Sequence, residues 1–423
     1  MAFKDLSEDQ FREILSTNLT PSATIKTPEL LFGREKALKQ IDRALSSQGR
    51  QVFIFGDRGV GKTSVALTTA NILQSANAAP IYVVCSQNDA FGDVIKAIGN
   101  SVVHIDSRIE KRGNTASGGG SFAGFGLNYK GGDKPQAVIE APTSLNAALD
   151  IIRYVLSKRK GKIIIVIDEM ERISESIQRD KFAEFIKNIP ELEERVKFIF
   201  CGIATTINAL IGAHPSAGRI LEPIHLERLH HNYLWDIIRN VADKVGVKVE
   251  WDALVRIGQI SDGFPHYVHL VGESMLWSAY DDPDPVTQIK STHFKAGIKG
   301  AIERAESVLR LQYEKATMKT KNTEDYEEAL WSMADKTSDR RQLSEVYEQS
   351  YKRIMFRRHK RTELTREKFN QRLLALRKDG HGGVLVGYGS GWFGFRENIL
   401  RGYVRLRAEN SGVELGKDHA MAS

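Results

Sequence analysis

The sequence predicts an α/β protein with a parallel sheet covered by helices, then a small helical domain, then a further domain of helices and short strands. Short apolar runs that are typical of buried strands recur in the first 226 residues, with helical patterns between most of them. From residue 230 to about residue 280 the pattern is helical throughout. The last part has three helical segments before two short apolar runs. The apolar runs of the sheet are 52–55, 81–84, 163–167, 198–200 and 224–226.

Length and composition exclude several classes of protein. A chain of 423 residues with 41% hydrophobic residues is long enough for two or three packed domains. No apolar run approaches the roughly 18 residues of a membrane span. The first ten residues, MAFKDLSEDQ, contain early acidic residues and no apolar stretch of a secretory signal. We therefore expect a cytoplasmic protein in which Cys85 and Cys201, both in strand-like apolar contexts, are buried reduced thiols.

The first 30 residues are expected to form a lead-in that contains a short helix. Ser7 and Gln10 have the spacing of a capping box before the sequence FREIL. A second helix is expected to end near Leu45, shortly before the first strand. These two helices precede the part of the chain that carries the chemistry.

The segment GDRGVGKTS directly follows the first predicted strand and fits a phosphate-binding loop. The pattern Gly-x-x-x-x-Gly-Lys-Thr lets backbone N–H groups converge on phosphate oxygens, while Lys62 would neutralise phosphate charge and the Thr63 hydroxyl would ligate Mg²⁺. Residues 64–74 are predicted to be helical, so a helix N-terminus would face the anion. The order of strand, loop and helix favours a site for ATP or ADP over a chance match in a glycine-rich turn. The candidate phosphate contacts are Gly56, Asp57, Arg58, Gly59, Val60, Gly61, Lys62, Thr63 and Ser64.

A second motif supplies the acidic residues that a nucleotide site needs. In GKIIIVIDEMERI a buried strand ends at Asp168 and Glu169, whose side chains would emerge at the carboxyl edge of the sheet. Asp168 would hold Mg²⁺ through water, and Glu169 would polarise the water that attacks the γ-phosphate. Together with the phosphate-binding loop, this motif predicts ATP hydrolysis.

The order of elements near the C-terminus is that of a winged helix. Three helices are expected at 324–333, 342–355 and 365–378, followed by apolar runs at 384–387 and 392–395 around a glycine and serine turn. In a helix-turn-helix arrangement the third helix enters the major groove of DNA. Its expected core residues are Phe369, Leu373 and Leu376, and its expected exposed residues are Arg366, Lys368, Asn370, Gln371 and Arg372.

Positive charge is concentrated in the same region. Between residues 352 and 378 there are eleven lysines and arginines but only two glutamates, whereas the rest of the chain has slightly more acidic than basic residues. A local basic surface is expected where a protein contacts nucleic acid. A solvated charged helix is the alternative interpretation. The candidate DNA contacts are Arg357, Arg358, Lys360, Arg361, Arg366, Lys368 and Arg372.

One low-complexity segment, residues 113–132, contains eight glycines interleaved with Phe122, Phe125 and Tyr129. Such a composition does not hold a rigid element by itself. The simpler interpretation is a flexible surface insertion. The alternative is a loop that a DNA strand or a neighbouring subunit orders through the aromatic residues.

The motif LFGRE at residues 31–35 resembles a motif of the origin-recognition, archaeal-ATPase and STAND branches of AAA+ type P-loop ATPases. The resemblance implies that Leu31, Phe32 and Gly33 contact the adenine. The sequence Gly-Phe-Pro at 263–265 is similar to a Gly-x-Pro motif in the helical lid of STAND ATPases, which implies that Pro265 packs on the nucleotide. His266 stands next to it where initiator-type proteins usually offer an arginine, so no sensor-2 arginine is assigned.

The same resemblance, which covers residues 28–280, implies two further roles. Thr205, after the strand KFIFC, is the candidate sensor-1 residue that reads the γ-phosphate. Arg219, shortly before the fifth strand, is the candidate arginine finger that reaches the ATP of a neighbouring subunit, with a surface arginine as the alternative.

The expected organisation is a P-loop (AAA+) core with a small helical lid and a C-terminal winged-helix domain. The function expected first is an ATPase that forms a homo-oligomer on ATP and engages duplex DNA, with no membrane association. The alternative is a STAND-like switch in which the nucleotide state gates binding of a protein partner. A small-molecule kinase is poorly supported, because no acceptor-substrate motif is present. The expected segments are a lead-in 1–30, the ATPase core 31–229, the lid 230–289, a helical connector 290–322, the winged helix 323–407 and a tail 408–423.

Overall fold

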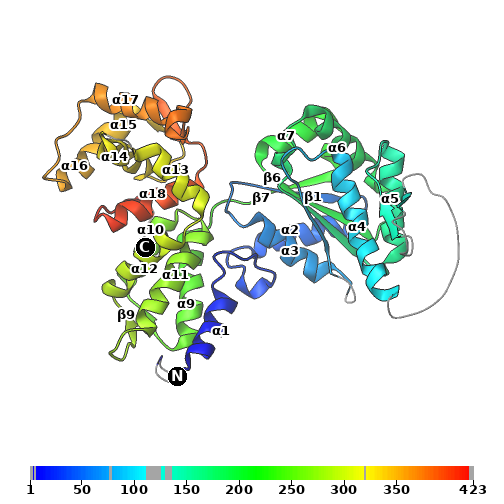
Figure 1. Ribbon diagram of the computed structural model, residues 1–423, viewed down its shortest axis with the longest axis horizontal. Helices are drawn as coiled ribbons and strands as arrows, with labels where there is room; N and C mark the ends of the chain where they lie inside the picture. Colours follow the sequence, from blue (N-terminus) through cyan, green and yellow to red (C-terminus); the bar gives the residue numbers. More distant parts are fainter. Residues whose placement is uncertain are drawn as a thin grey trace. The chain divides into compact units, whose positions relative to one another are not determined.

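A computed structural model describes residue 3 and residues 6–75, 79–110, 125–128, 136–318 and 321–418 (Figure 1). Most of the glycine-rich segment at 113–132, with Phe122 and Tyr129, lies outside the described residues. The chain divides into two compact units. Unit 1 comprises Met1–Ala23, Asp57–Val60 and Glu227–Ser423, and unit 2 comprises Thr24–Gly56 and Gly61–Leu226.

Unit 2 is built around a five-stranded, wholly parallel sheet in the order β2-β5-β6-β1-β7. Its five strands are the five runs that the sequence predicted. The central strand β6 and its neighbour β5 are buried along their whole length because helices cover both faces of the sheet. The strands are β1 (Gln51–Phe55), β2 (Ile81–Val84), β5 (Ile163–Asp168), β6 (Val196–Gly202) and β7 (Leu221–His225).

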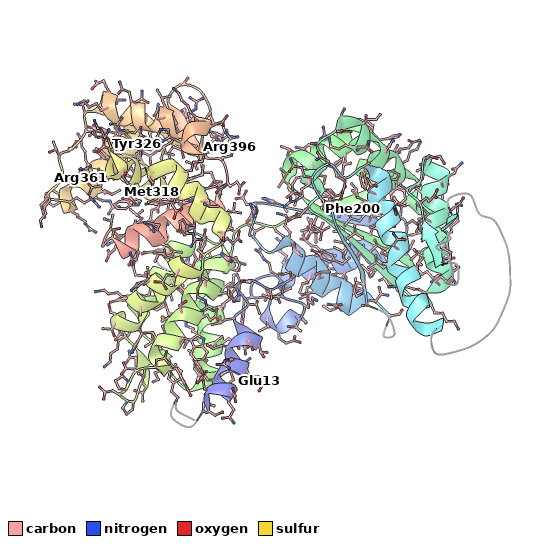
Figure 2. The ribbon with its side chains drawn as sticks, viewed as in Figure 1. Glu13, Phe200, Met318, Tyr326, Arg361 and Arg396 are labelled. Carbon is pink, nitrogen blue, oxygen red and sulfur yellow. The ribbon has the colours of Figure 1, made fainter. Side chains whose placement is uncertain are left out.

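Helices α4, α5 and α6 pack on one face of the sheet, and α2 and α3 pack on the other (Figure 1). The core on the first face is rich in aromatic rings, among them Phe198 and Phe200, whose rings stack with centroids 5.8 Å apart (Figure 2). The helices of unit 2 are α2 (Glu35–Ser46), α3 (Lys62–Leu73), α4 (Phe91–Glu110), α5 (Leu145–Lys158), α6 (Ser176–Asn188), α7 (Ala204–Ala213) and α8 (Ala217–Ile220). The remaining pieces are η2 (Pro28–Leu30), η3 (Met170–Arg172), η4 (Ile189–Glu191) and the hairpin β3 (Phe125–Asn128) with β4 (Gln136–Ile139).

Unit 1 contains the expected helical lid and also the N-terminal helix. The capping box at Ser7 and Gln10 is present at the start of α1 (Glu8–Asn18). This helix inserts Phe11 between Trp277 and Tyr280, with ring centroids 4.9 Å and 4.4 Å away. The lid elements are α9 (His231–Val245), β8 (Lys248–Val249), α10 (Trp251–Ser261), α11 (Pro265–Tyr280), β9 (Gln288–Ile289) and α12 (Ser291–Arg304), which packs along α11.

The C-terminal part of unit 1 has winged-helix topology, as the sequence predicted. Three helical segments are followed by a hairpin, and β10 pairs antiparallel with β12 to give a sheet in the order β10-β12-β11. Helix α18, which covers this domain, was not expected. The elements are α13 (Ser307–Thr317), α14 (Thr323–Ala334), β10 (Arg341–Gln342), α15 (Leu343–Glu345), the π-helix η5 (Val346–Tyr351), α16 (Lys352–Arg357), α17 (Arg366–Leu376), η6 (Asp379–His381), β11 (Leu385–Gly387), β12 (Trp392–Phe395) and α18 (Ile399–Asn410).

Across the described residues, no helix combines the length and the apolar character that crossing a membrane requires.

Candidate functional site

The phosphate-binding loop joins β1 to α3, as the sequence predicted. Gly59 and Gly61 have φ angles of 84° and 95°, a region that side-chain-bearing residues rarely adopt, so the loop needs glycine at both positions. Lys62 begins α3 and its Nζ donates a hydrogen bond to the carbonyl oxygen of Gly56, 3.0 Å away. The loop therefore curls back on itself at the N-terminus of a helix, where backbone N–H groups and the helix dipole favour an anion.

Asp57 and Arg58 of this loop group with unit 1, and protein groups engage both side chains there. The Asp57 carboxylate accepts hydrogen bonds from Arg228 and Asn398, each at 3.0 Å. The Arg58 guanidinium lies 3.3 Å from Glu397. Both predicted contact residues therefore have side chains that are already paired with protein groups.

Asp168 lies at the carboxyl end of β5 and is 3% exposed. Its Oδ2 accepts a hydrogen bond from the Thr63 hydroxyl at 2.6 Å, although the two residues are 105 positions apart. The same oxygen accepts a second hydrogen bond from the Tyr82 hydroxyl at 3.2 Å, and Oδ1 accepts the N–H of Glu169 at 2.8 Å. Sequence reasoning placed Thr63 and Asp168 together but missed Tyr82.

Thr63 and Asp168 fit a Mg²⁺ ion bound with a nucleotide. Both offer oxygen ligands, and Mg²⁺ is usually held by one or two protein groups together with phosphates and water. Among the described residues there is no cluster of three histidine, cysteine, aspartate or glutamate side chains that could hold a metal without phosphates. The donor set is therefore that of a nucleotide-linked cation and not of a site built from protein ligands alone.

Two glutamates follow Asp168, and they differ in environment. Glu169 adopts a left-handed conformation with φ of 55°, and its carboxylate pairs with Arg172, both side chains being partly exposed. Glu171 lies deeper, and its Oε2 is buried without a hydrogen-bond partner. Burial raises the pKa of Glu171, and the charge of Lys62 opposes that shift. Glu169 is the residue predicted to polarise water, and Glu171 is a second carboxylate that the sequence motif did not single out.

The thiols behave as expected for buried cysteines. Cys85 and Cys201 are both buried and free. Burial raises the pKa of Cys85 to about 12 and raises that of Cys201 well above its ordinary value, so both remain protonated at neutral pH.

The segment proposed to contact adenine lies in unit 2, as do Gly56 and residues 61–64 of the loop. Leu31 is buried, Phe32 is half-buried, and Gly33 has a φ of 69° while its N–H donates to Glu35 at 3.2 Å. Sequence reasoning missed a contact made by the residues just before this motif. The N–H of Ile25 donates to the Ser64 hydroxyl at 3.3 Å, so the chain entering unit 2 runs against the first turn of α3.

The four other residues considered from the resemblance lie on three helices, α7, α8 and α11. Thr205 is exposed in the first turn of α7, and Arg219 is exposed on α8, where its Nη2 donates to the Ser216 hydroxyl at 3.1 Å. Pro265 and His266 begin α11 in unit 1, and His266 Nδ1 lies 3.0 Å from the carbonyl oxygen of Pro21.

The seven basic residues predicted to contact DNA divide into two groups. The guanidinium groups of Arg358, Arg361 and Arg372 turn toward α14 and its acidic residues. Arg358 lies 3.0 Å from Glu328, a fully buried carboxylate whose pKa is raised by burial. Arg361 lies 2.8 Å from Asp325, and Figure 2 labels it in the same domain as Tyr326 of α14.

The other four basic residues are exposed. Arg366 and Lys368 lie in the first turn of α17, which Thr365 caps by accepting a hydrogen bond from the N–H of Lys368. Lys360 and Arg357 precede it, and Arg357 lies 3.9 Å from Glu414. The structure thus leaves these four side chains at the surface and uses the other three inside the domain.

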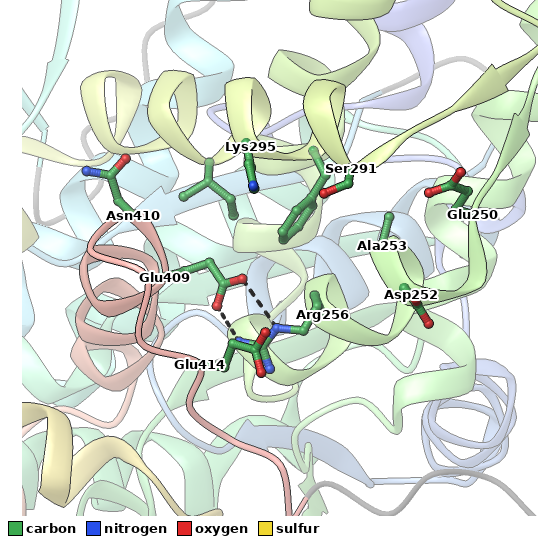
Figure 3. A pocket seen from close by; sticks show the side chains of 12 residues that line it. Glu250, Asp252, Ala253, Arg256, Ser291, Lys295, Glu409, Asn410 and Glu414 are labelled. Carbon is green, nitrogen blue, oxygen red and sulfur yellow. Dashed lines mark hydrogen bonds and ion pairs between the residues drawn. The ribbon is translucent and has the colours of Figure 1, made fainter. Parts of the chain in front are cut away.

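A separate hollow of about 630 Å³ lies in unit 1 between α10, α12 and the segment after α18 (Figure 3). Arg256 points into it but is already paired with Glu409 and donates to the carbonyl oxygen of Leu415 at 3.1 Å. The rim mixes acidic and basic residues over an apolar floor that includes Phe294. None of the residues predicted to bind nucleotide or DNA lines this hollow.

Comparison with known proteins connects these features to a family. Residues 31–271 match the model of an ATPase domain found predominantly in Archaea. A search of curated proteins gives no match. The solved structure of the Walker-type ATPase of Pyrococcus abyssi is similar over 91% of this chain and 99% of its own, with 14% identity and a TM-score of 0.53.

Two other solved structures, both from Aeropyrum pernix, show weaker similarity. The ORC2 protein in its ADPNP–ADP complexes covers 95% of this chain and 98% of its own, with 12% identity and a TM-score of 0.48. The ORC1 protein in complex with DNA covers 91% and 94%, with 15% identity and a TM-score of 0.45. At these identities the similarities concern the fold alone.

Proposed function

Because the chain belongs to the family of ATPase domains found predominantly in Archaea, we propose that it hydrolyses ATP with Mg²⁺ and couples the nucleotide state to binding of duplex DNA. This membership confirms the resemblance to AAA+ P-loop ATPases that the sequence motifs indicated. The proposal has two parts. Family membership supports ATP hydrolysis, which we call the nucleotide half, and the winged helix supports DNA binding, which we call the DNA half.

The hydrogen bond of 2.6 Å between Thr63 and Asp168 carries the nucleotide half. It brings the hydroxyl of the phosphate-binding loop to the acidic end of β5, where a nucleotide-linked Mg²⁺ would need both. The ion, when bound, would neutralise charge on the phosphate oxygens. Lys62 would bind the β- and γ-phosphates, and Thr63 can donate its proton to Asp168 while its oxygen still offers lone pairs.

Glu169 is proposed to polarise the attacking water. It follows Asp168 directly, so the same strand end presents both carboxylates at the carboxyl edge of the sheet. A carboxylate within hydrogen-bond reach of the water accepts its proton as the bond to phosphorus forms. Thr205 would read the γ-phosphate, and Arg219, exposed on α8, would reach the nucleotide of a neighbouring copy in a homo-oligomer.

The winged-helix topology and the exposed basic residues on α17 support the proposal that the chain binds DNA. Arg366 and Lys368 lie in the first turn of the third helix of the motif, the part that enters the major groove in helix-turn-helix proteins. Lys360 and Arg357, also exposed, would add phosphate contacts. We therefore propose these four residues as the DNA-contacting set.

One observation favours the alternative, a nucleotide-gated switch that acts through a protein partner. Arg358, Arg361 and Arg372 pair with acidic residues of α14, so the basic segment carries less outward charge than its sequence suggests. In that alternative the winged helix would present a protein-binding surface, and no salt-dependent DNA affinity is expected.

Hydrolysis is tested by comparing Glu169→Gln with Lys62→Ala. The first variant should bind ATP normally while kcat falls about 100-fold or more, because only the polarisation of water is lost. The second should lose nucleotide affinity itself. The measurements are phosphate release and binding of a fluorescent ATP analogue. Unchanged phosphate release in both variants would show that the activity does not arise from this site.

A further inference from the structure

Tyr82 is the part of the nucleotide site that no motif indicated. It lies on β2, the strand at one edge of the sheet, where side chains alternate between the two faces. Ile81 and Val83 are buried on one face, whereas Tyr82 and Val84 are each 42% exposed on the other. The face that carries Tyr82 is the one against which α3 packs, which brings the tyrosine to the side of Thr63.

The register of the sheet explains how the tyrosine reaches the acidic end of β5. Tyr82 pairs with Val166, and Val84 pairs with Asp168. Asp168 is thus two residues, or about 6.6 Å, further along its strand than the partner of Tyr82. A phenol ring that lies along the strand can span this distance, and its hydroxyl meets Oδ2 of Asp168 at 3.2 Å.

Three donors together hold the Asp168 carboxylate. The N–H of Glu169 binds Oδ1 at 2.8 Å, while the hydroxyls of Thr63 and Tyr82 both bind Oδ2. The N–H of Glu169 fixes Oδ1 at the end of the strand, so the two hydroxyls set the orientation of Oδ2.

Packing alone does not account for a tyrosine at this position. An exposed edge-strand position accepts any β-branched or aromatic residue. Phenylalanine would provide the same ring at this position, so the hydroxyl is the feature that remains to be explained, and Asp168 is the partner it contacts.

We propose that Tyr82 is a positioning residue of the nucleotide site, whose hydroxyl orients Asp168 toward Thr63 and thereby sets how much Mg²⁺ is needed for tight nucleotide binding. This inference rests on the proposed function, because it assumes that Asp168 and Thr63 serve a Mg²⁺–nucleotide complex. Tyr82 acts through Asp168 and does not contact the phosphates in this account.

The test is the Mg²⁺ dependence of nucleotide binding in Tyr82→Phe. Mg²⁺ is expected to strengthen nucleotide binding, and the quantity compared is the Mg²⁺ concentration that gives half of this increase in affinity. Loss of one hydrogen bond to a charged group should raise that concentration about 3- to 10-fold. Affinity for ADP in the presence of EDTA should stay unchanged, because the phosphate loop is intact. Binding is followed with a fluorescent ADP analogue while Mg²⁺ is titrated into the protein.

The matched control is Tyr233→Phe, which removes a hydroxyl from a tyrosine of similar exposure, 40%, on α9 of unit 1. It should titrate like the wild type. A Tyr82→Phe curve that overlays the wild-type curve would overturn the proposal. So would a variant whose affinity falls equally with and without Mg²⁺, since that pattern indicates a general packing role.

Failure of the proposed function gives a different result. If the wild-type protein bound no nucleotide, or if Lys62→Ala bound it as well as the wild type does, both the function and the role of Tyr82 would be overturned. Mg²⁺-dependent binding in the wild type with an unshifted Tyr82→Phe curve would overturn the role of Tyr82 alone.

Discussion

At the scale of single residues, short-range contacts bring together the groups of the candidate nucleotide site. Thr63 and Asp168 meet at 2.6 Å, and Lys62 turns back to the carbonyl of Gly56 at 3.0 Å. Motif spacing predicted the identities of these residues, since each type has a fixed chemical task in a phosphate site. It could not predict Tyr82, because that contact depends on the register between β2 and β5, which no local pattern encodes.

His269 gives unit 1 a dependence on pH. This histidine lies in α11 and is 4% exposed, and its Nδ1 accepts a hydrogen bond from the N–H of Thr20 at 3.3 Å. Burial lowers its pKa from the ordinary value of 6.5 to about 4, with a smaller contribution from the charge of His266. The folded state therefore binds fewer protons than the unfolded state between these two values. The contribution of His269 to the free energy of unfolding is therefore fully present above pH 6.5 and is lost as the pH falls toward 4.

We predict that lowering the pH from 7 to 5 decreases the free energy of unfolding of the wild type by about 2 kcal/mol more than that of His269→Gln. Glutamine can accept the same hydrogen bond from Thr20 but does not titrate. The measurement is urea unfolding of both proteins at the two pH values. Parallel losses of stability in the two proteins would mean that other groups cause the pH dependence.

At the scale of elements, the basic segment shows where sequence reasoning reached its limit. The order of helices and strands predicted the winged helix, and Phe369, Leu373 and Leu376 are buried as expected. The roles of individual arginines could not be predicted in the same way. Their acidic partners lie on α14, 30 or more positions earlier, and only the fold brings the two segments together. The acidic sequence EDYEE of α14 is the one signal that could have suggested it.

The two groups of basic residues should respond differently to mutation. Arg361→Ala removes a partner of Asp325 and of the fully buried Glu328, so it should lower the free energy of unfolding by about 1–3 kcal/mol. Lys368→Ala removes an exposed charge on α17, so stability should change by less than about 0.5 kcal/mol.

For DNA affinity we expect the opposite order, with the larger loss in Lys368→Ala. Lys368→Ala should weaken binding for all sequences and reduce the slope of log K against log salt by about 1, as expected for one lost phosphate contact. Chemical denaturation and DNA titration of both variants provide the check. A Lys368→Ala protein that keeps full affinity, with an Arg361→Ala protein that is stable but no longer binds, would reverse our assignment of the two groups.

At the scale of the whole molecule, the lid and the winged helix belong to one unit. Asp262, which ends α10 in a left-handed conformation, is 2% exposed and accepts from Arg401 at 2.5 Å and from Arg405 at 3.1 Å, both on α18. Burial lowers the pKa of Arg405 to about 10, which still leaves it charged at neutral pH. The buried ion pairs couple the two expected domains, so a nucleotide-driven change in the lid would also move the winged helix.

That coupling was not predictable from the sequence. The lid and the winged helix were expected as separate segments, 230–289 and 323–407, joined by a connector. α18 lies after the last predicted strand and carries the arginines that reach Asp262. The N-terminal residues up to Ala23 also belong to unit 1 because Phe11 packs on the aromatic residues of α11. Long-range packing of this kind leaves no local pattern.

The central claim is that the nucleotide site and the winged helix act together on DNA. The most direct measurement is duplex-DNA affinity across a salt series with ATP, with ADP and with the variant Lys62→Ala. We expect log K to fall steeply with log salt, by about 0.9 for each phosphate contacted. We also expect tighter binding with ATP than with ADP, and no effect of ATP in the variant. Weak binding that changes with neither salt nor nucleotide would contradict the claim and favour a switch that acts through a protein partner.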